Sequence, residues 1–259
     1  MSPDNPFSLH GKTALVAGAS RGIGQAIAEA LARAGARTIL AARSTQALQS
    51  IVESLRAEGC DAAALPLDIS SKSSRHEAAQ AAGPVDILLN VAGTNLRKRA
   101  ADYTPEEYER ILNTNLTGVF ELTQLIGKGM IERARGGKIV MIGSLTSLIG
   151  LPYVPVYTIT KAALAGLTRS LAAEWGQHAI QVNCIAPGFI LTDLNREMWK
   201  PPHMTAWLQS VQPNPRIGTP QDIAPLAVFL SGPGSDYITG QLIVVDGGLS
   251  ATCMWPFQP

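Results

Sequence analysis

The sequence predicts an α/β fold built on one doubly wound parallel sheet of seven strands, with helices on both faces. Short apolar runs of β-type residues alternate with longer helical runs along the chain. Most of the short runs are continuously apolar, as expected for strands that are covered on both faces. The 259 residues are enough for one large core, so we expect a single domain over 1–259.

Seven apolar runs are the expected strands, and they leave few topologies other than one doubly wound sheet with right-handed crossovers. They are Thr13–Ala17, Thr38–Ala42, Ala62–Leu67, Ile87–Val91, Lys138–Ile142, Ile180–Ile185 and Leu242–Val245. The first helix is expected over Gly24–Ala34, where Ile27 and Leu31 recur at the spacing of a buried helical stripe. Gly35 follows as a typical C-terminal stop.

One segment, the excursion from Asp193 to Arg216, interrupts this alternation of strands and helices. It contains four prolines and two tryptophans, namely Pro201, Pro202, Pro213, Pro215, Trp199 and Trp207. A long connection of this kind in an open α/β sheet lies beyond the carboxyl ends of the strands, where ligands bind. We therefore expect it to be a substrate loop, whose tryptophans either close over the site or pack between subunits.

Composition excludes several classes of protein. Hydrophobic residues make up 46% and charged residues 16%, which is typical of a soluble globular chain. The net charge of +1 argues against a nucleic-acid partner, and the basic cluster Arg97–Arg99 is too short to change this. Three scattered cysteines without metal-ligand spacing favour reduced thiols and no metal site. Without a signal peptide or a run of roughly 20 apolar residues, we expect a cytoplasmic protein that does not contact a membrane.

A glycine-rich stretch, Gly18–Gly24, follows the first predicted strand and leads into the first predicted helix. Glycines there let the backbone turn tightly and approach a pyrophosphate, which the helix N-terminus attracts. Three glycines alone often serve only a turn, but the strand before them and the helix after them favour a Rossmann-type dinucleotide site. The candidate cofactor-binding residues of this loop are Gly18, Ser20, Arg21, Gly22, Ile23 and Gly24.

The end of the second predicted strand indicates which nicotinamide cofactor binds. An NAD(H) enzyme is expected to carry a carboxylate there, which binds the ribose 2′-hydroxyl and would repel a 2′-phosphate. The sequence has Ala42 and Arg43 instead, with Arg21 as a second cation and Ser44 as a further donor. A guanidinium can bind phosphate oxygens through two hydrogen bonds. We expect NADP(H) as the preferred cofactor and NAD(H) as the alternative; the other interpretation is that both arginines are ordinary surface residues.

Ser144, Tyr157 and Lys161 are the strongest catalytic candidates. Tyr157 and Lys161 are four residues apart in a helical stretch, so they project from the same face. A tyrosine phenol is a poor base at neutral pH, and a nearby ammonium favours its phenolate form. Ser144 lies at the end of the fifth predicted strand and can donate a hydrogen bond to a substrate oxygen. A Tyr/Lys pair alone is usually a surface pair, so the interpretation depends on the whole combination.

That combination resembles the short-chain dehydrogenase/reductase family from Lys12 to Gly248. The spacing of the glycines, the Ser/Tyr/Lys set and Asn115 all agree with the family pattern. The sequence departs from it at Ala17 and Val91, where the family usually has Thr and Asn.

The resemblance implies hydride transfer between nicotinamide and a secondary alcohol or ketone, usually by a homotetramer. Tyr157 would exchange a proton with the substrate oxygen, and Lys161 would also hold the nicotinamide ribose. Asn115 would anchor a water that links Lys161 to solvent. The remaining cofactor contacts that it implies are Asp68, Ile69, Asn90, Ala92, Gly93, Pro187, Gly188, Ile190 and Thr192.

The substrate is indicated less directly. Asn95 and Arg97 leave the fourth predicted strand at its carboxyl end, so with Ser144 they are the candidate substrate contacts. These residues and the Asn214–Pro220 stretch resemble the sugar-acid branch, which includes gluconate 5-dehydrogenase and 2-deoxygluconate 3-dehydrogenase. An exposed solubilising run is the other interpretation of the cations. A 3-oxoacyl-carrier-protein reductase is the alternative function, and a cofactor-binding sensor without turnover is a third.

Overall fold

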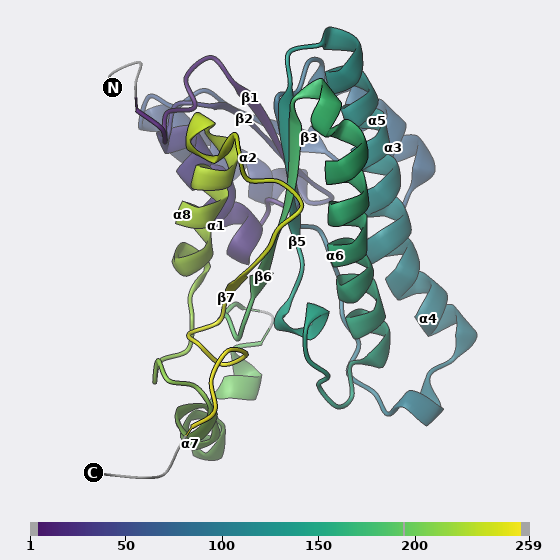
Figure 1. Ribbon diagram of the computed structural model, residues 1–259, viewed down its shortest axis with the longest axis vertical. Coiled ribbons are helices and arrows are strands. Elements are labelled where there is room, and N and C mark those ends of the chain that lie inside the picture. The colour runs from purple at the N-terminus through teal and green to yellow at the C-terminus, as the bar shows by residue number, and fades with distance from the viewer. Residues whose placement is uncertain (1–4, 194, 255–259) are drawn as a thin grey trace.

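The computed structural model describes residues 5–193 and 195–254, which contain one parallel sheet of seven strands (Figure 1). The strands are β1 (Thr13–Ala17), β2 (Arg37–Ala42), β3 (Ala62–Pro66), β4 (Ile87–Asn90), β5 (Gly137–Ile142), β6 (Ile180–Pro187) and β7 (Leu242–Val245). Their order in the sheet is β3-β2-β1-β4-β5-β6-β7. The predicted doubly wound topology is therefore confirmed.

Eight α-helices connect the strands within the described residues, together with short turns of other helix types. They are α1 (Gly22–Arg33), α2 (Thr45–Ala57), α3 (Lys72–Ala82), α4 (Pro105–Leu112), α5 (Gly118–Arg133), α6 (Pro155–Trp175), α7 (Pro202–Val211) and α8 (Pro220–Ser231). α1, α2 and α8 cover one face of the sheet, and α3, α5 and α6 cover the other (Figure 1).

The two cores share the strands between them because successive side chains in a strand point to opposite faces. Val16 packs into the core beneath α1, α2 and α8, while its neighbour Leu15 packs into the core beneath α3, α5 and α6. Both side chains are fully buried. This burial on both faces explains why the central strands are continuously apolar in the sequence.

All seven predicted strands are present, and the differences lie at their ends. β6 extends to Pro187, two residues beyond its predicted end, because its last residues pair with β7. β3 ends at Pro66 rather than Leu67. α1 begins at Gly22 rather than the predicted Gly24, directly after the extended backbone of Arg21. The helix therefore starts inside the glycine-rich stretch.

The chain reverses its direction across the sheet between β1 and β4, which are neighbours. In an open α/β sheet, ligands bind beyond the carboxyl ends of the strands at such a switch point. The loops after β1, β4, β5 and β6 all leave at this edge. α7, inside the excursion, lies beyond the same end of the sheet (Figure 1).

Candidate active site

The glycine-rich loop is closed by backbone packing. Gly18 has a φ of 98°, and a Cβ added there would lie 2.6 Å from the amide nitrogen of Ala92. A Cβ added at Gly24 would lie 2.1 Å from the carbonyl oxygen of Gly18. Any larger residue at either position would push the loop apart.

The N-terminus of α1 is left open to an anion. Ser44, Ser71 and Thr104 each accept a hydrogen bond from the first turn of the helix that follows them. Among the described residues, Arg21 makes no such side-chain bond at the start of α1. The first N–H groups of α1 are therefore available to a ligand that carries negative charge.

The end of β2 carries the predicted cofactor-selecting residues. Ala42 is buried, whereas Arg43 and Ser44 are exposed. The Ser44 hydroxyl accepts a hydrogen bond from the Ala47 N–H at 3.4 Å, so it also caps α2. Arg43 lies close enough to Asp68 to act on it: hydrogen bonding from Ser70 lowers the pKa of Asp68, and the positive charge of Arg43 lowers it further.

Arg75, which no pattern in the sequence singles out, holds the loop that contains Asp68 and Ile69. Arg75 is 2% exposed and donates a hydrogen bond to the Ile69 carbonyl at 2.7 Å. Arg75 also forms an ion pair with Glu121 of α5, and this contact lowers the pKa of Glu121. A basic residue in a short helix gives no sign of such a role unless its distant partners are known.

Asn90 braces the sheet. Its side chain is 2% exposed and donates to the Thr123 hydroxyl at 2.9 Å and to the Met141 sulfur at 3.3 Å. The amide therefore connects β4 to α5 and to β5. Beyond it, Gly93 lies at the cleft, where an added Cβ would be 3.6 Å from Lys161 Nζ.

Asn115 lies in a π-helical turn, Asn113–Thr117, between α4 and α5. Such turns are rare and occur frequently at functional sites. Its side chain is fully buried; Oδ1 accepts a bond from the Thr94 N–H at 2.7 Å, and Nδ2 donates to the Thr94 carbonyl at 2.8 Å. Nδ2 also lies 3.2 Å from the Thr160 hydroxyl. Asn115 thus joins the loop after β4 to α6.

Ser144 lies two residues after β5 and begins a short helical turn. Its hydroxyl oxygen accepts a hydrogen bond from the Thr146 N–H at 3.1 Å. Ser147, which no pattern in the sequence singles out, accepts a bond from the Ser144 N–H at 3.2 Å and donates to the Lys161 carbonyl at 2.7 Å. Ser147 therefore links the Ser144 turn to α6.

Directly behind this turn lies Cys184 of β6. A Cβ added at Gly143 would be 2.8 Å from its sulfur. Burial raises the pKa of the Cys184 thiol to about 11. The side chain at this position therefore contributes packing to the site and no negative charge at neutral pH.

Tyr157 and Lys161 are both in α6, as predicted. Lys161 Nζ lies 5.5 Å from the centre of the Tyr157 ring and donates a hydrogen bond to the Ile142 carbonyl at 2.6 Å. The lysine is 4% exposed, and the tyrosine is half-buried. A buried ammonium next to a partly accessible phenol can stabilise negative charge on the phenol oxygen.

The polar residues of the loop after β4 differ in their surroundings. Arg97 and Asn95 are exposed. Lys98 instead forms an ion pair with Glu107 at 2.8 Å, and its N–H donates to the Tyr153 carbonyl at 2.8 Å. Tyr153 has a φ of 67°, a strained conformation for an aromatic residue, four residues before Tyr157.

The two tryptophans of the excursion contact the same ring within the chain. Trp199 and Trp207 pack edge-on against Phe189, with ring centres 5.2 and 5.4 Å apart respectively. Trp199 is buried, while Trp207 remains 40% exposed. Trp199 therefore belongs to an internal aromatic cluster, and the structure does not place it over Tyr157.

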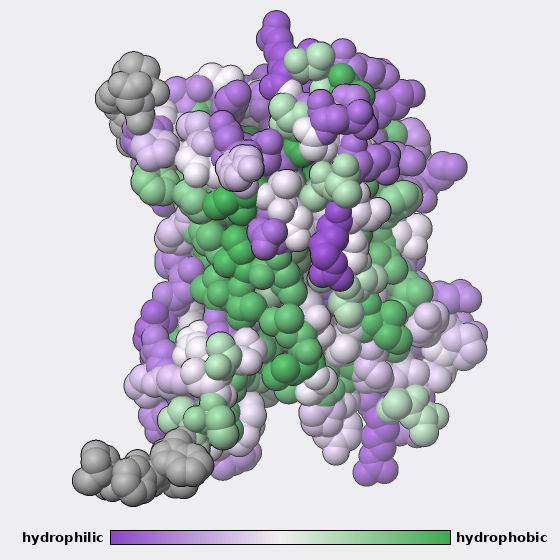
Figure 2. Space-filling model, viewed as in Figure 1, coloured by the Kyte–Doolittle hydropathy of each residue, from purple (hydrophilic) through white to green (hydrophobic). Residues whose placement is uncertain are grey.

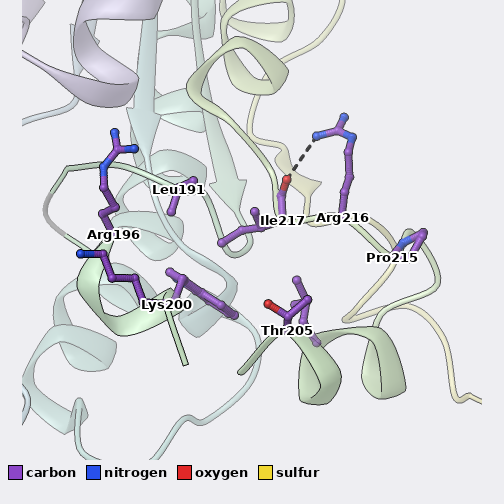
Figure 3. A pocket seen from close by; sticks show the side chains of 9 residues that line it. Leu191, Arg196, Lys200, Thr205, Pro215, Arg216 and Ile217 are labelled. Atoms are coloured by element: carbon purple, nitrogen blue, oxygen red, sulfur yellow. Dashed lines mark hydrogen bonds between the residues drawn. The ribbon is translucent and has the colours of Figure 1, made fainter. Parts of the chain in front are cut away.

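A cavity of about 300 Å³ is formed mainly by residues of the excursion itself. It is lined by Leu191, Arg196, Trp199, Lys200, Thr205, Leu208, Pro215, Arg216 and Ile217. Figure 3 shows Arg196 and Lys200 on one side of it and Arg216 on the other. Each of these three cations has an acidic partner: Asp193, Glu197 and Asp222 respectively.

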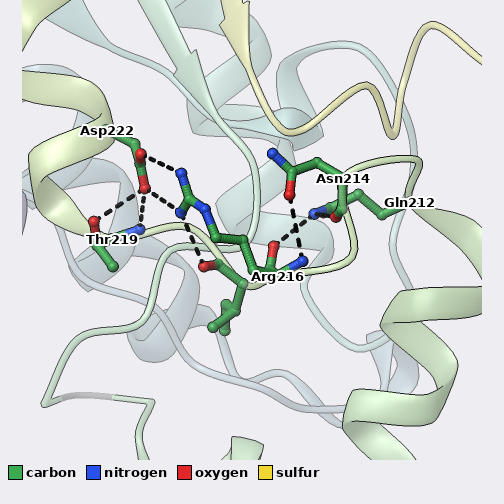
Figure 4. A network of polar contacts seen from close by, with 6 residues as sticks. Gln212, Asn214, Arg216, Thr219 and Asp222 are labelled. Atoms are coloured by element: carbon green, nitrogen blue, oxygen red, sulfur yellow. Dashed lines mark hydrogen bonds and ion pairs between the residues drawn. The ribbon is translucent and has the colours of Figure 1, made fainter.

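Arg216 makes the most ordered of these pairs. Its guanidinium donates two hydrogen bonds to the Asp222 carboxylate, at 2.7 and 2.6 Å (Figure 4). Asp222 also accepts a bond from the Thr219 N–H at the start of α8. Hydrogen bonding from Arg216 lowers the pKa of Asp222 well below its usual value.

Among the described residues, the helices are too short or too polar to cross a membrane. A family model described as enoyl-(acyl carrier protein) reductase matches residues 18–250.

Two sequence relatives cover nearly the whole chain. A gluconate 5-dehydrogenase of Gluconobacter oxydans is 36% identical over 256 residues, covering 97% of this chain and 100% of that protein. The 3-oxoacyl-[acyl-carrier-protein] reductase of Pseudomonas aeruginosa is 40% identical over 247 residues, covering 94% and 99% respectively. Among solved structures, a gluconate 5-dehydrogenase from Burkholderia cenocepacia in complex with NADP and tartrate matches with a TM-score of 0.91. It is 33% identical, and the match covers 96% of this chain and 98% of that one.

Proposed function

Since the chain belongs to the short-chain dehydrogenase/reductase family, whose members are oxidoreductases of CH–OH and C=O groups, we propose that it oxidises or reduces a sugar acid with NADP(H). The observation that carries this proposal is the arrangement at the carboxyl edge of the sheet. Lys161 lies beside the half-buried ring of Tyr157, and Asn115 fixes the loop against α6. The solved gluconate 5-dehydrogenase from Burkholderia cenocepacia is in complex with NADP and tartrate, and tartrate is a hydroxy acid.

The residues of the cleft fit NADP(H). The open N-terminus of α1 and the tight glycine loop suit a pyrophosphate. Ala42 is buried, so the end of β2 has no carboxylate at this position to repel a phosphate on the ribose 2′-oxygen of the cofactor. Arg43 and Arg21 are exposed and are available to that 2′-phosphate. Asp68 and Ile69 would hold the adenine. Gly93 and Lys161 would contact the nicotinamide ribose, and Ile190 and Thr192 would hold the carboxamide.

The catalytic steps of the chain itself follow from its side chains. When bound, the cofactor supplies or accepts the hydride. In reduction, Ser144 donates a hydrogen bond to the substrate oxygen, and Tyr157 gives that oxygen its phenolic proton. The Lys161 ammonium stabilises the negative charge left on the phenol. Asn115 holds Thr94 and Thr160 in place, so the loop after β4 keeps its position beside Lys161.

A second candidate is reduction of a 3-oxoacyl thioester. It is favoured by the 40% identity to the Pseudomonas aeruginosa reductase and by the family model's description. The cavity formed by the excursion has an apolar part, made by Leu191, Trp199, Leu208 and Ile217, which suits an acyl chain.

We also propose a single domain that works as a cytoplasmic homotetramer. Phe120 of α5 and Ile159 of α6 are 42% and 48% exposed, so each of these helices leaves a large apolar side chain at the surface. At the other side of the sheet, the edge strand β7 is only half-buried. Figure 2 shows hydrophobic surface gathered around the position of β7. Burial of both areas against further copies would remove them from water.

One substrate screen tests the function. Sugar acids, their uncharged polyol analogues and 3-oxoacyl thioesters are each offered with NADPH or NADP⁺, and also with NADH or NAD⁺, and cofactor absorbance is followed. We expect turnover of a sugar acid with the phosphorylated cofactor. Turnover of thioesters alone would establish the second candidate, and cofactor binding without turnover of any compound would contradict both.

A further inference from the structure

The excursion is fixed at each end by a side-chain amide. At its C-terminal end, Gln212 Nε2 donates to the carbonyls of Asn214 at 2.5 Å and Arg216 at 2.9 Å (Figure 4). At its N-terminal end, Asn195 makes the equivalent contacts to the turn that follows β6. These two ends differ in what they hold: Gln212 holds the approach to α8, whereas Asn195 holds a turn at the cofactor cleft.

Asn195 bonds to the Ile190–Thr192 turn through both atoms of its amide. Nδ2 donates to the Ile190 carbonyl at 2.8 Å. Oδ1 accepts from the Thr192 N–H at 2.8 Å and from the Thr192 hydroxyl at 3.4 Å. The Asn195 N–H also donates to the Thr192 carbonyl at 3.1 Å. Asn195 therefore makes four hydrogen bonds to this turn.

The turn lies against the glycine loop and is held on its other side by Gly218. A Cβ added at Gly22 would lie 3.3 Å from Thr192 Cγ2. Gly218 pairs with the turn through the Phe189 carbonyl and the Leu191 N–H. Because backbone groups alternate along an extended strand, the Ile190 N–H points away from Gly218.

The contact with Asn195 determines in which direction the Thr192 hydroxyl proton points. Asn195 Oδ1 can only accept, so the hydroxyl proton points toward Asn195 and the oxygen lone pairs point elsewhere. The turn then offers one acceptor, Thr192 Oγ1, and one donor, the Ile190 N–H. A primary carboxamide, with an NH₂ donor and a carbonyl acceptor, is complementary to this pair.

We propose that Asn195 is a positioning residue that sets the Thr192 hydroxyl as an acceptor and so selects a carboxamide on the nicotinamide ring. The inference rests on the proposed function, because it concerns the cofactor of the same site. Asn195 acts through Thr192 and does not itself touch the cofactor. Because Asn195 lies near the start of the excursion, it also links the excursion to the cleft.

The test compares two dinucleotides that differ only at the selected group. NADP⁺ carries the carboxamide, and its 3-acetylpyridine analogue has a methyl ketone without the NH₂ donor. We expect wild type to bind NADP⁺ more tightly, and Asn195→Ala to reduce that preference by about 3- to 10-fold, the scale of one hydrogen bond. Asn195→Asp keeps the acceptor, so the preference should persist even if overall affinity falls.

Two controls separate this role from a structural one. Asn214→Ala makes the same change at the other end of the excursion, where Oδ1 accepts a bond from the Arg216 N–H, and should leave the preference unchanged. Binding of 2′-phospho-ADP-ribose, which lacks nicotinamide, reports on the rest of the cleft. If Asn195→Ala weakens all three ligands by the same factor, Asn195 is only structural and the inference is wrong. If wild type binds none of them, the proposed function fails first.

Discussion

The catalytic centre and the excursion are held together by different kinds of contact. The side chain of Asn115 is fully buried and makes hydrogen bonds to Thr94 and Thr160, residues far away in the sequence. In the excursion, Arg196 pairs with Asp193 and Lys200 with Glu197, each three residues apart and exposed. Exposed pairs of this kind contribute little to stability. The chemistry therefore depends on the whole fold, whereas these exposed pairs of the excursion can vary without disturbing it, as expected in a segment that sets substrate choice.

The largest effect is expected from the phenol of the catalytic centre. Tyr157→Phe removes only the hydroxyl, so we expect kcat to fall by roughly 100- to 10,000-fold while the Kd for NADPH changes little. Steady-state rates and fluorescence titration measure the two quantities. Tyr237→Phe, on a fully exposed side chain, is the matched control and should behave as wild type. Retention of most of the wild-type kcat would remove Tyr157 from the mechanism.

A smaller effect is expected at the end of β2. Arg43→Ala should weaken NADPH binding by about 1.5–3 kcal/mol, the scale of a charge-assisted hydrogen bond, and leave NADH binding unchanged. Ala42→Asp should reverse the preference toward NADH. Arg37→Ala, on an exposed arginine at the other end of β2, is the control. Equal Kd values for the two cofactors in wild type would contradict the assignment.

The loop after β4 tests where substrate recognition begins. Arg97→Ala should lower kcat/KM for a sugar acid by about 10-fold, corresponding to one charge-assisted contact, and leave an uncharged polyol unaffected. Arg135→Ala, on an exposed arginine at the opposite edge of the sheet, serves as the control. An equal loss on acid and polyol would show that Arg97 does not recognise a carboxylate.

The smallest effect concerns the end of the excursion. Because the folded-state pKa of Asp222 lies below the unfolded value of about 3.9, its carboxylate stabilises the fold above that pH. This stabilisation is lost as the pH falls toward the lower folded-state pKa. Asp222→Asn should lower the free energy of unfolding by about 1 kcal/mol at pH 7, as loss of a helix cap does, and by less near pH 2.

Urea titrations at the two pH values measure this difference. Asp193→Asn alters an exposed pair at the other end of the excursion and should change the free energy of unfolding at neither pH. A loss at pH 7 that persisted in full at pH 2 would mean that the charge of Asp222 is not what stabilises the start of α8.

The sequence predicted best what depends on local pattern. The seven strands follow from apolar runs, and the placement of Tyr157 and Lys161 on one helix follows from their spacing. It did not identify Ser147, Arg75 or Asn195, because each acts through hydrogen bonds to backbone carbonyls whose positions only the folded chain determines. Polar residues of these types are equally common in turns and at surfaces, so their type alone carries no signal.

The buried cysteine beside the catalytic turn has a practical consequence for spectroscopy. Since its pKa is raised to about 11, the Cys184 thiol carries almost no thiolate at neutral pH and should resist alkylating dyes. Cys253 is exposed, in the segment after β7. Gly247 in that segment accepts a hydrogen bond from the Asn214 N–H at the end of the excursion. A maleimide fluorophore can therefore be attached at Cys253 once the partly exposed Cys60 has been replaced, and it would report movement of the end of the excursion during turnover.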